Sequence, residues 1–542
     1  MTKFRILQKK FYKSIEKGDV ITIENILQKK SPHDIKNLII SHSRNVCSPL
    51  LVACKYGNIT IFKLLANYID FTQFEYGIDC LKTALDHDHL DIFKLLLNKI
   101  NITTEYVQSF FVDAVRNEHT EIVTLMLARG ADINKEADLL KYAFHDGNEE
   151  IIKLLIHNGI NINVVFTHDF TRGYGCCVTP LHIACELGYI DVVILLLEKG
   201  ASIYNLDNNG CSPIFDASTK GHIAIVELLL QVAKRDGKLH QYLNSCDIHG
   251  RSLLQKTIKP KRDMVIPLIT HGADIIQTNS KNNRNILFDA CVHGYTDIVE
   301  FLINHKDYKR KDGTLNTDLL NIRDEHGFSP IHMTTNPEII ELLSIYGANI
   351  NAQAHNNSTP LSIAIFRNNI EGVKMLIKCG ANVNQRTGND IYYTTPLHIA
   401  CTNNGKKIVE LLLKHGANIC TDSYGKYPLH DTYSVEIIQL LLDYGAISDH
   451  IFHARDTDGQ TPLFHICNNG YVISAKKLLD NGADIDIVDN NGDTPLSIAQ
   501  KSKNTKMVEF LEKVKQNLLK KQISLEQRCY LVINKYNIQF AC

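Results

Sequence analysis

One segment, TPLHIACELGYIDVVILLLEKGASI from Thr179, recurs in variant forms along most of the chain. Clear copies, each opening with a small hydroxyl residue and proline, begin at Ser212, Thr395, Thr461 and Thr494. The interval from Thr179 to Ser212 is 33 residues, and that from Thr461 to Thr494 is the same. A fixed period of this length indicates a stack of equivalent units, because one such unit cannot bury its apolar face alone.

Each unit reads as two short helices followed by a turn. Thr or Ser at the first position can cap a helix whose first turn holds proline. Gly188 suits the end of that helix, and Val192, Leu195 and Leu196 have the spacing of a second, amphipathic helix. Between units lies an Asp-x-x-Gly turn, in which glycine supplies a positive φ. These turns are Asp207–Gly210, Asp247–Gly250, Asp324–Gly327, Asp422–Gly425, Asp456–Gly459 and Asp489–Gly492.

Weaker copies fill most of the remaining chain. They begin at Ser48, Ser252, Asn285, Ser329, Thr359 and Tyr427, with more degenerate ones near Lys9, Asp79, Ser109 and Asp138. We expect an array of about fifteen units over residues 1–514, degenerate in 1–163 and clearest in 179–230 and 359–514. Residues 515–542 are expected to form a C-terminal helical cap or tail, since the open end of a stack needs a polar cover.

The Thr-Pro-Leu-His-x-Ala signature and its 33-residue period resemble those of ankyrin-repeat proteins. The resemblance implies an all-α repeat solenoid of helix-turn-helix units with β-hairpin-like fingers, whose fingers and concave face bind a protein. His182, His332, His398 and His430 stand fourth in the signature, where the resemblance implies a hydrogen bond within the first turn. The abundance of Ile, Lys and Asn also resembles ankyrin proteins of AT-rich genomes, such as giant amoebal viruses, amoebae or intracellular bacteria.

Charge and hydropathy exclude several classes of partner. The chain has 58 Lys and Arg against 59 Asp and Glu, so it lacks the positive excess of a general nucleic-acid binder. The aliphatic run Val192–Leu197 is far shorter than the roughly 20 residues that span a bilayer. No apolar stretch near the N-terminus resembles a signal peptide. We therefore expect a monomer of the cytoplasm or nucleus, or of the host cytoplasm if a virus or parasite makes it, with no nucleic-acid partner and no membrane insertion.

The cysteines and histidines form no catalytic, cofactor or metal motif. Cys54, Cys185, Cys291 and Cys401 each follow an alanine at one helix position, as small apolar residues of a reducing compartment would. The vicinal pair Cys176–Cys177 lacks a second ligand pair at zinc spacing. The Asp-x-x-Gly turns lack the terminal Glu of a calcium loop, and no phosphate-binding or nucleophile motif occurs. The sequence predicts no enzyme and no cofactor.

Three intervals exceed the period, through insertions in Val164–Val178, Ala233–Ser245 and Asn304–Asn321. Insertions in repeat proteins map to loops on one face, often the binding face, although a surface loop also tolerates drift without a role. Aromatic and arginine side chains supply most of the binding energy of protein interfaces. Tyr242 is the aromatic residue of the second insertion. From the insertions, the 385–394 finger and the finger tips, we expect partner contacts at Phe170, Arg172, Tyr174, Asn208, His249, Tyr308, Arg310, His326, Arg386, Tyr392 and Tyr393.

The sequence thus favours a non-catalytic protein–protein interaction scaffold. One alternative is a substrate adaptor for a ubiquitin ligase, for which only the short segment Tyr530–Cys542 could recruit the ligase. Another is a viral or parasite effector that sequesters a host protein. An enzyme with its site in an insertion is a further alternative. Affinity capture with and without Lys513–Cys542 would separate the scaffold from the adaptor.

Overall fold

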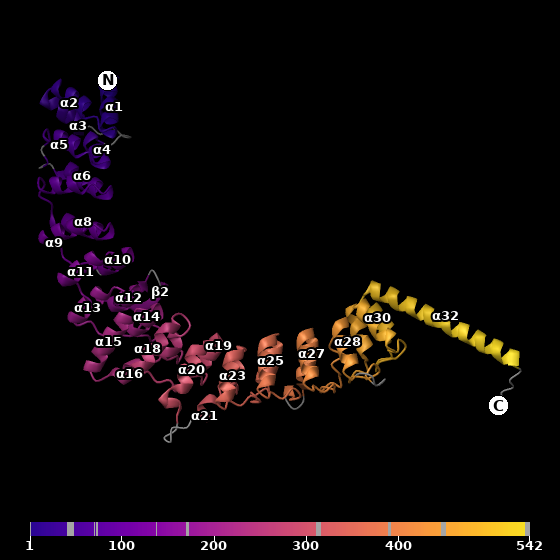
Figure 1. Cartoon of the computed structure of the whole chain (residues 1–542). Helices are drawn as coiled ribbons and strands as arrows, with labels where there is room; N and C mark the ends of the chain where they lie inside the picture. Colours follow the sequence, from indigo (N-terminus) through magenta and orange to yellow (C-terminus); the bar gives the residue numbers. More distant parts are fainter. Residues whose placement is uncertain are drawn as a thin grey trace. The chain divides into compact units, whose positions relative to one another are not determined.

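The computed structural model describes residues 2–40, 48–69, 71, 74–136, 138–169, 173–309, 316–388, 392–445 and 451–536. It divides into two compact units, Met1–Tyr242 (unit 1) and Leu243–Cys542 (unit 2). Both are built almost wholly from short helices, and Figure 1 labels them. The prediction of an all-α repeat solenoid is confirmed. None of the helices in these residues is long and apolar enough to cross a membrane.

Unit 1 consists of successive helix pairs, with one hairpin between the fifth and sixth pair. Its elements, the last of which ends at the unit boundary, are α1 (Thr2–Glu16), α2 (Val20–Gln28), α3 (Pro32–Ile40), α4 (Pro49–Tyr56), α5 (Ile59–Ala66), α6 (Phe74–Asp86), α7 (Leu90–Leu97), α8 (Thr104–Arg116), α9 (Thr120–Ala128), α10 (Leu139–Asp146), α11 (Glu149–His157), β1 (Phe166–Asp169), β2 (Gly173–Val178), α12 (Pro180–Leu187), α13 (Ile190–Glu198), α14 (Pro213–Lys220), α15 (Ile223–Arg235) and α16 (Leu239–Leu243).

Unit 2 continues the same pattern and ends in the longest helix of the chain (Figure 1). Its elements are α17 (Leu253–Thr257), η1 (Arg262–Met264), α18 (Val265–Thr270), α19 (Ile286–His293), α20 (Thr296–Asn304), η2 (Lys306–Tyr308), α21 (Thr317–Leu320), α22 (Pro330–Met333), α23 (Pro337–Ile345), α24 (Pro360–Phe366), α25 (Ile370–Lys378), β3 (Thr387–Gly388), β4 (Tyr393–Thr394), α26 (Pro396–Thr402), α27 (Lys406–Lys414), α28 (Val435–Asp443), α29 (Pro462–Asn469), α30 (Val472–Asp480), α31 (Pro495–Lys501) and α32 (Thr505–Tyr536).

The first helix of a repeat begins and ends as its residues predict. In α24, the side chain of Thr359 accepts the amide of Ser362, and proline follows the cap. In α12, the helix ends at Gly188, whose φ of 83° is readily adopted only by glycine. These local signals fix the length of the first helix and the point where the second can start.

Each helix packs against its counterparts in the neighbouring repeats. First helices contact first helices, as α12 does with α14, and second helices contact second helices, as α25 does with α27. Between them lie fully buried apolar side chains such as Ala184, Val192 and Leu196. Because a repeat shares its core only with its neighbours, the stability of the array is a sum of repeat and interface terms.

The insertions adopt three different structures, and two of them differ from the expectation of loops that project outward. The first contains the β1–β2 hairpin. The second extends α15 and adds α16, which buries Tyr242 against Tyr204 with 5.5 Å between ring centroids. The third includes η2, where Tyr308 is fully buried and its hydroxyl accepts a hydrogen bond from Asn285. Tyr242 and Tyr308 are therefore core residues, because burying a phenol ring removes a large apolar area from water.

Candidate protein-binding surface

Each finger is folded around one buried side chain, which is aspartate in most repeats. In the finger 455–460, Asp456 Oδ1 accepts the amides of Asp458 and Gln460 at 3.0 and 2.9 Å. Its backbone is paired with Gln460, and Gly459 donates to its carbonyl oxygen. The same pattern occurs at Asp207, Asp247, Asp324 and Asp489. The Asp-x-x-Gly motif thus has a structural role as a finger former.

The carboxylate of Asp247 stays ionised despite its burial. At Asp247, burial alone would raise the pKa, but the backbone amides and the guanidinium of Arg251 stabilise the charged form. Together these interactions hold the pKa of Asp247 below its ordinary value. The finger that Asp247 forms therefore keeps these hydrogen bonds in the neutral pH range.

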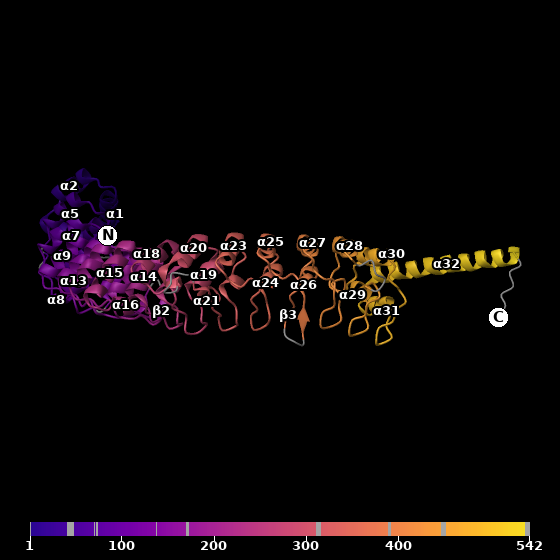
Figure 2. The same ribbon diagram turned by 60° about the horizontal axis from the view of Figure 1, so that its bottom comes forward.

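The fingers of unit 2 are bonded to one another at their tips. From the finger 324–328 onward, each finger donates one backbone amide to a carbonyl oxygen of the preceding finger, and the row of fingers lies along one edge of the helices (Figure 2). The bonds are Glu325 to Asn282, His355 to His326, Gly388 to Asn356, Ser423 to Tyr393, Thr457 to Tyr424 and Asn490 to Asp458, with N···O distances between 2.9 and 3.1 Å. We call this series the finger ladder. It holds the exposed tips at fixed mutual positions.

The signature histidines join each first helix to the next finger. His398 Nδ1 lies 2.7 Å from the hydroxyl of Thr395, and its Nε2 donates to the carbonyl oxygen of Lys426 at 2.9 Å. The bond within the first turn agrees with the expectation, and the bond to the next finger is additional. Burial lowers the pKa of His398 and of His332, which makes an equivalent pair of bonds. These rings are neutral structural links between repeats.

The expected contact residues fall into three groups. Phe170, Arg172 and Arg310 lie outside the described residues, and Tyr174 lies in β2 opposite His168 with a side chain that is also outside them. Tyr308 is in the core, so an outward contact role for it is wrong. The remaining six residues lie on the fingers, five of them exposed and Tyr393 half-buried: Asn208, His249, His326, Arg386, Tyr392 and Tyr393.

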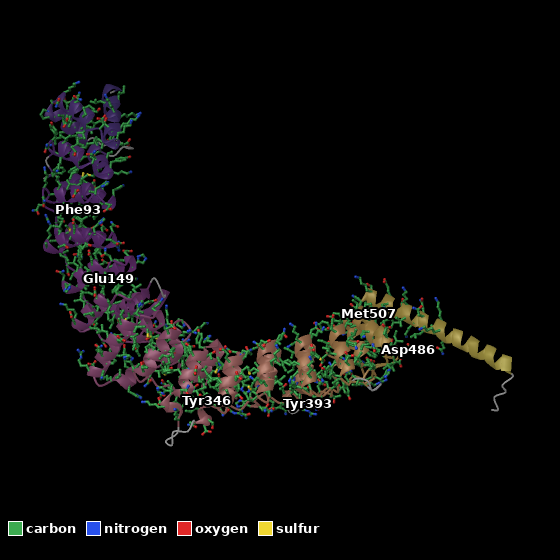
Figure 3. The ribbon with its side chains drawn as sticks, in the orientation of Figure 1. Phe93, Glu149, Tyr346, Tyr393, Asp486 and Met507 are labelled. Carbon is green, nitrogen blue, oxygen red and sulfur yellow. The ribbon has the colours of Figure 1, made fainter. Side chains whose placement is uncertain are left out.

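Three of these residues form a cluster with one that sequence reasoning missed. The guanidinium of Arg386 lies over the ring of Tyr393, 4.1 Å from its centroid. Tyr392 stacks on Tyr424 of the next finger, with 5.6 Å between centroids and 26° between planes. Tyr392 and Tyr424 are 55% and 45% exposed. Figure 3 labels Tyr393 in this part of unit 2.

Tyr424 could have been found from its place in the repeat. It is the third residue of the turn Asp422–Gly425, as His249 and His326 are in their own turns. That position is exposed in all three fingers. We call Arg386, Tyr392, Tyr393 and Tyr424 the aromatic cluster.

A second exposed aromatic pair lies at the other end of the repeats. Tyr433 precedes α28 and Tyr471 caps α30, so both lie where first and second helices meet. Their rings stack at 4.4 Å with 9° between planes, and they are 40% and 39% exposed. This pair matches the stacked tyrosines of the aromatic cluster in chemistry but not in position.

The polar groups with shifted pKa values all have local explanations. Burial raises the pKa of Asp289 to about 6, although Gln255 and Arg284 favour its charged form. Burial lowers the pKa of His430 to about 4, and the neighbouring His465 adds to this effect. In the part of the chain that the structure describes, no group of three or more His, Cys, Asp or Glu side chains could hold a metal ion.

Comparison with known proteins gives relatives that share parts of the array. The chain is 31% identical over 306 residues to an ankyrin repeat and KH domain-containing protein, mask-1, of Caenorhabditis elegans, covering 48% of this chain and 11% of the relative. It is 35% identical over 231 residues to the ankyrin repeat protein nuc-2 of Neurospora crassa, covering 41% and 20%. It is 21% identical over 421 residues to the human transient receptor potential cation channel subfamily A member 1, covering 74% and 36%. The chain thus spans little more than a third of the length of these relatives at most.

The family pattern described as ankyrin repeats, in three copies, matches the chain in five places. The matched residues are 14–106, 166–240, 315–387, 386–451 and 433–521, which together exceed half of the chain. They include most of the helix pairs, the signature histidines and most of the fingers described above. The chain belongs to the ankyrin-repeat family.

Proposed function

We propose that the chain is a non-catalytic scaffold that binds a partner protein through the fingers and the first-helix face of unit 2. The observation that carries this proposal is the aromatic cluster on the finger ladder. Its exposed rings come from consecutive fingers whose tips are joined by backbone hydrogen bonds. Aromatic residues held in this way bury a large area on binding at a small cost in conformational entropy.

The other polar features of unit 2 support a scaffold in preference to an enzyme. The buried aspartates form the fingers, and the histidines link helices to fingers. The carboxylate of Asp289 accepts a hydrogen bond from Gln255, and burial together with this carboxylate raises the pKa of the Cys291 thiol, which disfavours its nucleophilic form. The groups whose pKa values are shifted thus serve the fold. A catalytic site requires a nucleophile, an acid or base and a stabilising group in mutual reach.

The test is capture of the partner by the full chain in cells of its source, with proximity labelling as the readout. The double variant Tyr392→Ala/Tyr424→Ala should lose most of the labelling of specific neighbours. The control is Tyr433→Ala/Tyr471→Ala, which removes the other stacked pair of the same unit and should leave labelling unchanged. Equal labelling by both variants and the parent would refute a binding role for the aromatic cluster and the fingers that carry it.

Finer roles stay predictions. They are the ubiquitin-ligase adaptor, the viral or parasite effector, a monomeric state, the lack of a nucleic-acid partner and a cytoplasmic or nuclear location. The limits of the array at residue 514 and of the C-terminal cap also stay predictions, and α32 runs across that limit.

A further inference from the structure

We propose that the outer face of α1 and α2, at one end of unit 1, binds a membrane surface rich in anionic phospholipids (Figure 1). Lysines of α1 pair with the headgroups, and two exposed isoleucines enter the boundary between headgroups and acyl chains. The contact is peripheral and inserts no helix. It is independent of the proposed function, because it involves neither the fingers nor the first helices of unit 2.

Basic residues are concentrated in the first five helices of the chain. Residues 1–66, which contain α1 to α5, have twelve Lys and Arg against four Asp and Glu, whereas the whole chain has 58 against 59. Nine of the twelve are lysines whose side chains the structure describes, and eight of these nine are exposed. The positive charge is thus a local excess on a chain that is neutral as a whole.

The lysines of α1 form a stripe along its exposed side. The buried side of α1 contains Phe11 and Ile15 and packs on α2 and α4. Lys10, Lys13 and Lys17 follow one another at intervals of three and four residues, which places them together on the opposite side of the helix. Lys17 directly follows the last residue of α1, and its amide still donates to the carbonyl oxygen of Lys13 at 3.2 Å.

A polar cover for a repeat does not require charges of one sign. Like charges three or four residues apart on a helix repel each other and lower the stability of the free protein. Lys10, Lys13 and Lys17 form no ion pair with a carboxylate of the described residues. The nearby carboxylate of Asp19 caps α2, accepting the amide of Thr22 at 3.0 Å and its hydroxyl at 2.6 Å. An anionic surface laid on the stripe would relieve the repulsion.

Two large aliphatic side chains are exposed on the same outer face. Ile6 is 66% exposed and precedes Lys10 by one helical turn, in line with the stripe. Ile21 is 72% exposed and lies on the side of α2 opposite the buried Ile23. Because α1 packs on α4 and α2 packs on α5, these outer sides face away from the next repeat. Aliphatic side chains in this position are removed from water when they enter the acyl boundary of a membrane.

Nucleic acids and acidic peptides also attract lysines, but the residue types on this face favour a lipid surface. Nucleic-acid sites use arginine forks and aromatic rings that stack on bases. The outer face instead presents lysines, which are mobile point charges without a fixed hydrogen-bonding geometry, together with Ile6 and Ile21. An aliphatic side chain has no partner on a phosphate backbone, whereas a bilayer offers acyl chains beside its phosphates.

The experiment is flotation of the full chain with phospholipid vesicles of two compositions. Vesicles of phosphatidylcholine with about 30% phosphatidylserine should carry the protein at an ionic strength of about 0.15 M, and vesicles of phosphatidylcholine alone should not. Lys10→Gln/Lys13→Gln/Lys17→Gln should lower the partition coefficient at least about tenfold. The control Lys99→Gln/Lys135→Gln/Lys199→Gln makes the same change in net charge at three exposed lysines elsewhere in unit 1, and should lower it less than about twofold.

Two further variants separate charge, insertion and folding. Lys10→Arg/Lys13→Arg/Lys17→Arg keeps the charge of the stripe and should bind within about twofold of the parent. Ile6→Ser/Ile21→Ser should lower the partition coefficient at least about threefold, because the inserted apolar area is lost. Urea unfolding of each variant checks that the fold is intact.

Several outcomes would overturn the proposal. They are equal binding to the two vesicle compositions, equal losses in the two lysine-to-glutamine variants, and binding that is unaffected by Ile6→Ser/Ile21→Ser. Displacement of the protein from the vesicles by a DNA duplex at an equal concentration of phosphate would assign the lysines to nucleic acid instead. Tyr392→Ala/Tyr424→Ala should bind the vesicles as the parent does, so failure of this proposal and failure of the proposed function are distinguishable.

Discussion

The imidazole of His222 lies over Gly188 of the preceding repeat, and its Nε2 donates a hydrogen bond to the carbonyl oxygen of Glu186 at 3.1 Å. His89 has the same relation to Gly57, donating to the carbonyl oxygen of Lys55 at 2.9 Å. The residue that starts a second helix thus covers the glycine that ends the first helix of the previous repeat. In these repeats glycine is needed both for its φ and for the space above it.

Replacing Gly188 by alanine should therefore destabilise the array by more than the cost of placing alanine at a positive φ. A Cβ there would lie 2.5 Å from Cε1 of His222, whereas Gly200 also has a positive φ but no atom within 4 Å. We expect Gly200→Ala to cost about 1–2 kcal/mol of the free energy of unfolding. Gly188→Ala should cost roughly 1–3 kcal/mol more, as overpacking does. Urea unfolding measures both losses, and equal losses would contradict the contact between position 188 and His222. Adding His222→Ala to Gly188→Ala should remove most of the difference.

A second link between repeats is made by asparagine, and its loss should be measurable. Asn384 Nδ2 donates to the carbonyl oxygen of Gly416 at 2.9 Å, and its Oδ1 accepts the amide of Asn418 at 2.7 Å. Asn384→Ala leaves both backbone groups without these partners and should cost about 1–2 kcal/mol. The amide of Asn418 should also exchange with solvent faster. The control is Asn382→Ala, because the Asn382 side chain accepts the local amide of Asn384. If Asn382→Ala speeds the exchange of the Asn418 amide as much as Asn384→Ala does, the link is refuted.

Acid should weaken the repeat that contains His430. Burial and the neighbouring His465 lower the pKa of His430 to about 4, below the value of about 6.5 expected in the unfolded chain. The unfolded state thus binds more protons between these values, so this stabilisation is complete above pH 6.5 and falls as the pH drops toward 4. Burial raises the pKa of Asp431 to about 6, which acts in the opposite direction.

The contribution of His430 is isolated by substitution. His430→Gln should flatten the fall of the urea midpoint between pH 7 and pH 5, and the exposed finger-tip variant His326→Gln should leave it as in the parent. A slope that is unchanged by His430→Gln would show that another group governs this pH range.

Thiol reactivity should follow burial. The cysteines of the described residues are free thiols, with Cys185 and Cys401 fully buried and Cys246 exposed. Burial raises the pKa of Cys185 and Cys401 well above the ordinary value, and the thiolate is the reactive form. Iodoacetamide at neutral pH should label the exposed Cys246 before the two buried residues, which should react at least about a hundredfold more slowly, through unfolding. Mass spectrometry of the native protein that finds comparable labelling would contradict the stacked arrangement.

The residues that recur in every repeat predicted the helices and turns well. The sequences of the insertions did not show whether their side chains point into the core or toward solvent. The first helix of a repeat was predictable because Thr179, proline and Gly188 act locally on the backbone. Tyr393 was also predictable, because it precedes a repeat start and lies on a finger. Tyr308 was not, since its insertion has no period to show whether a side chain points inward. Its buried hydroxyl accepts a hydrogen bond from Asn285, the cap of α19, which lies far from it in the sequence.

Each bond of the finger ladder and each asparagine link joins two adjacent repeats of unit 2. A force applied along the stack would therefore pass through every interface in series, and the weakest interface would open first. Each repeat that peels away would release a segment of about 33 residues, or roughly 110 Å of chain at about 3.3 Å per residue. We therefore expect the array to unfold under force one repeat at a time. A bound partner that contacts several fingers would make those repeats unfold together in one larger step.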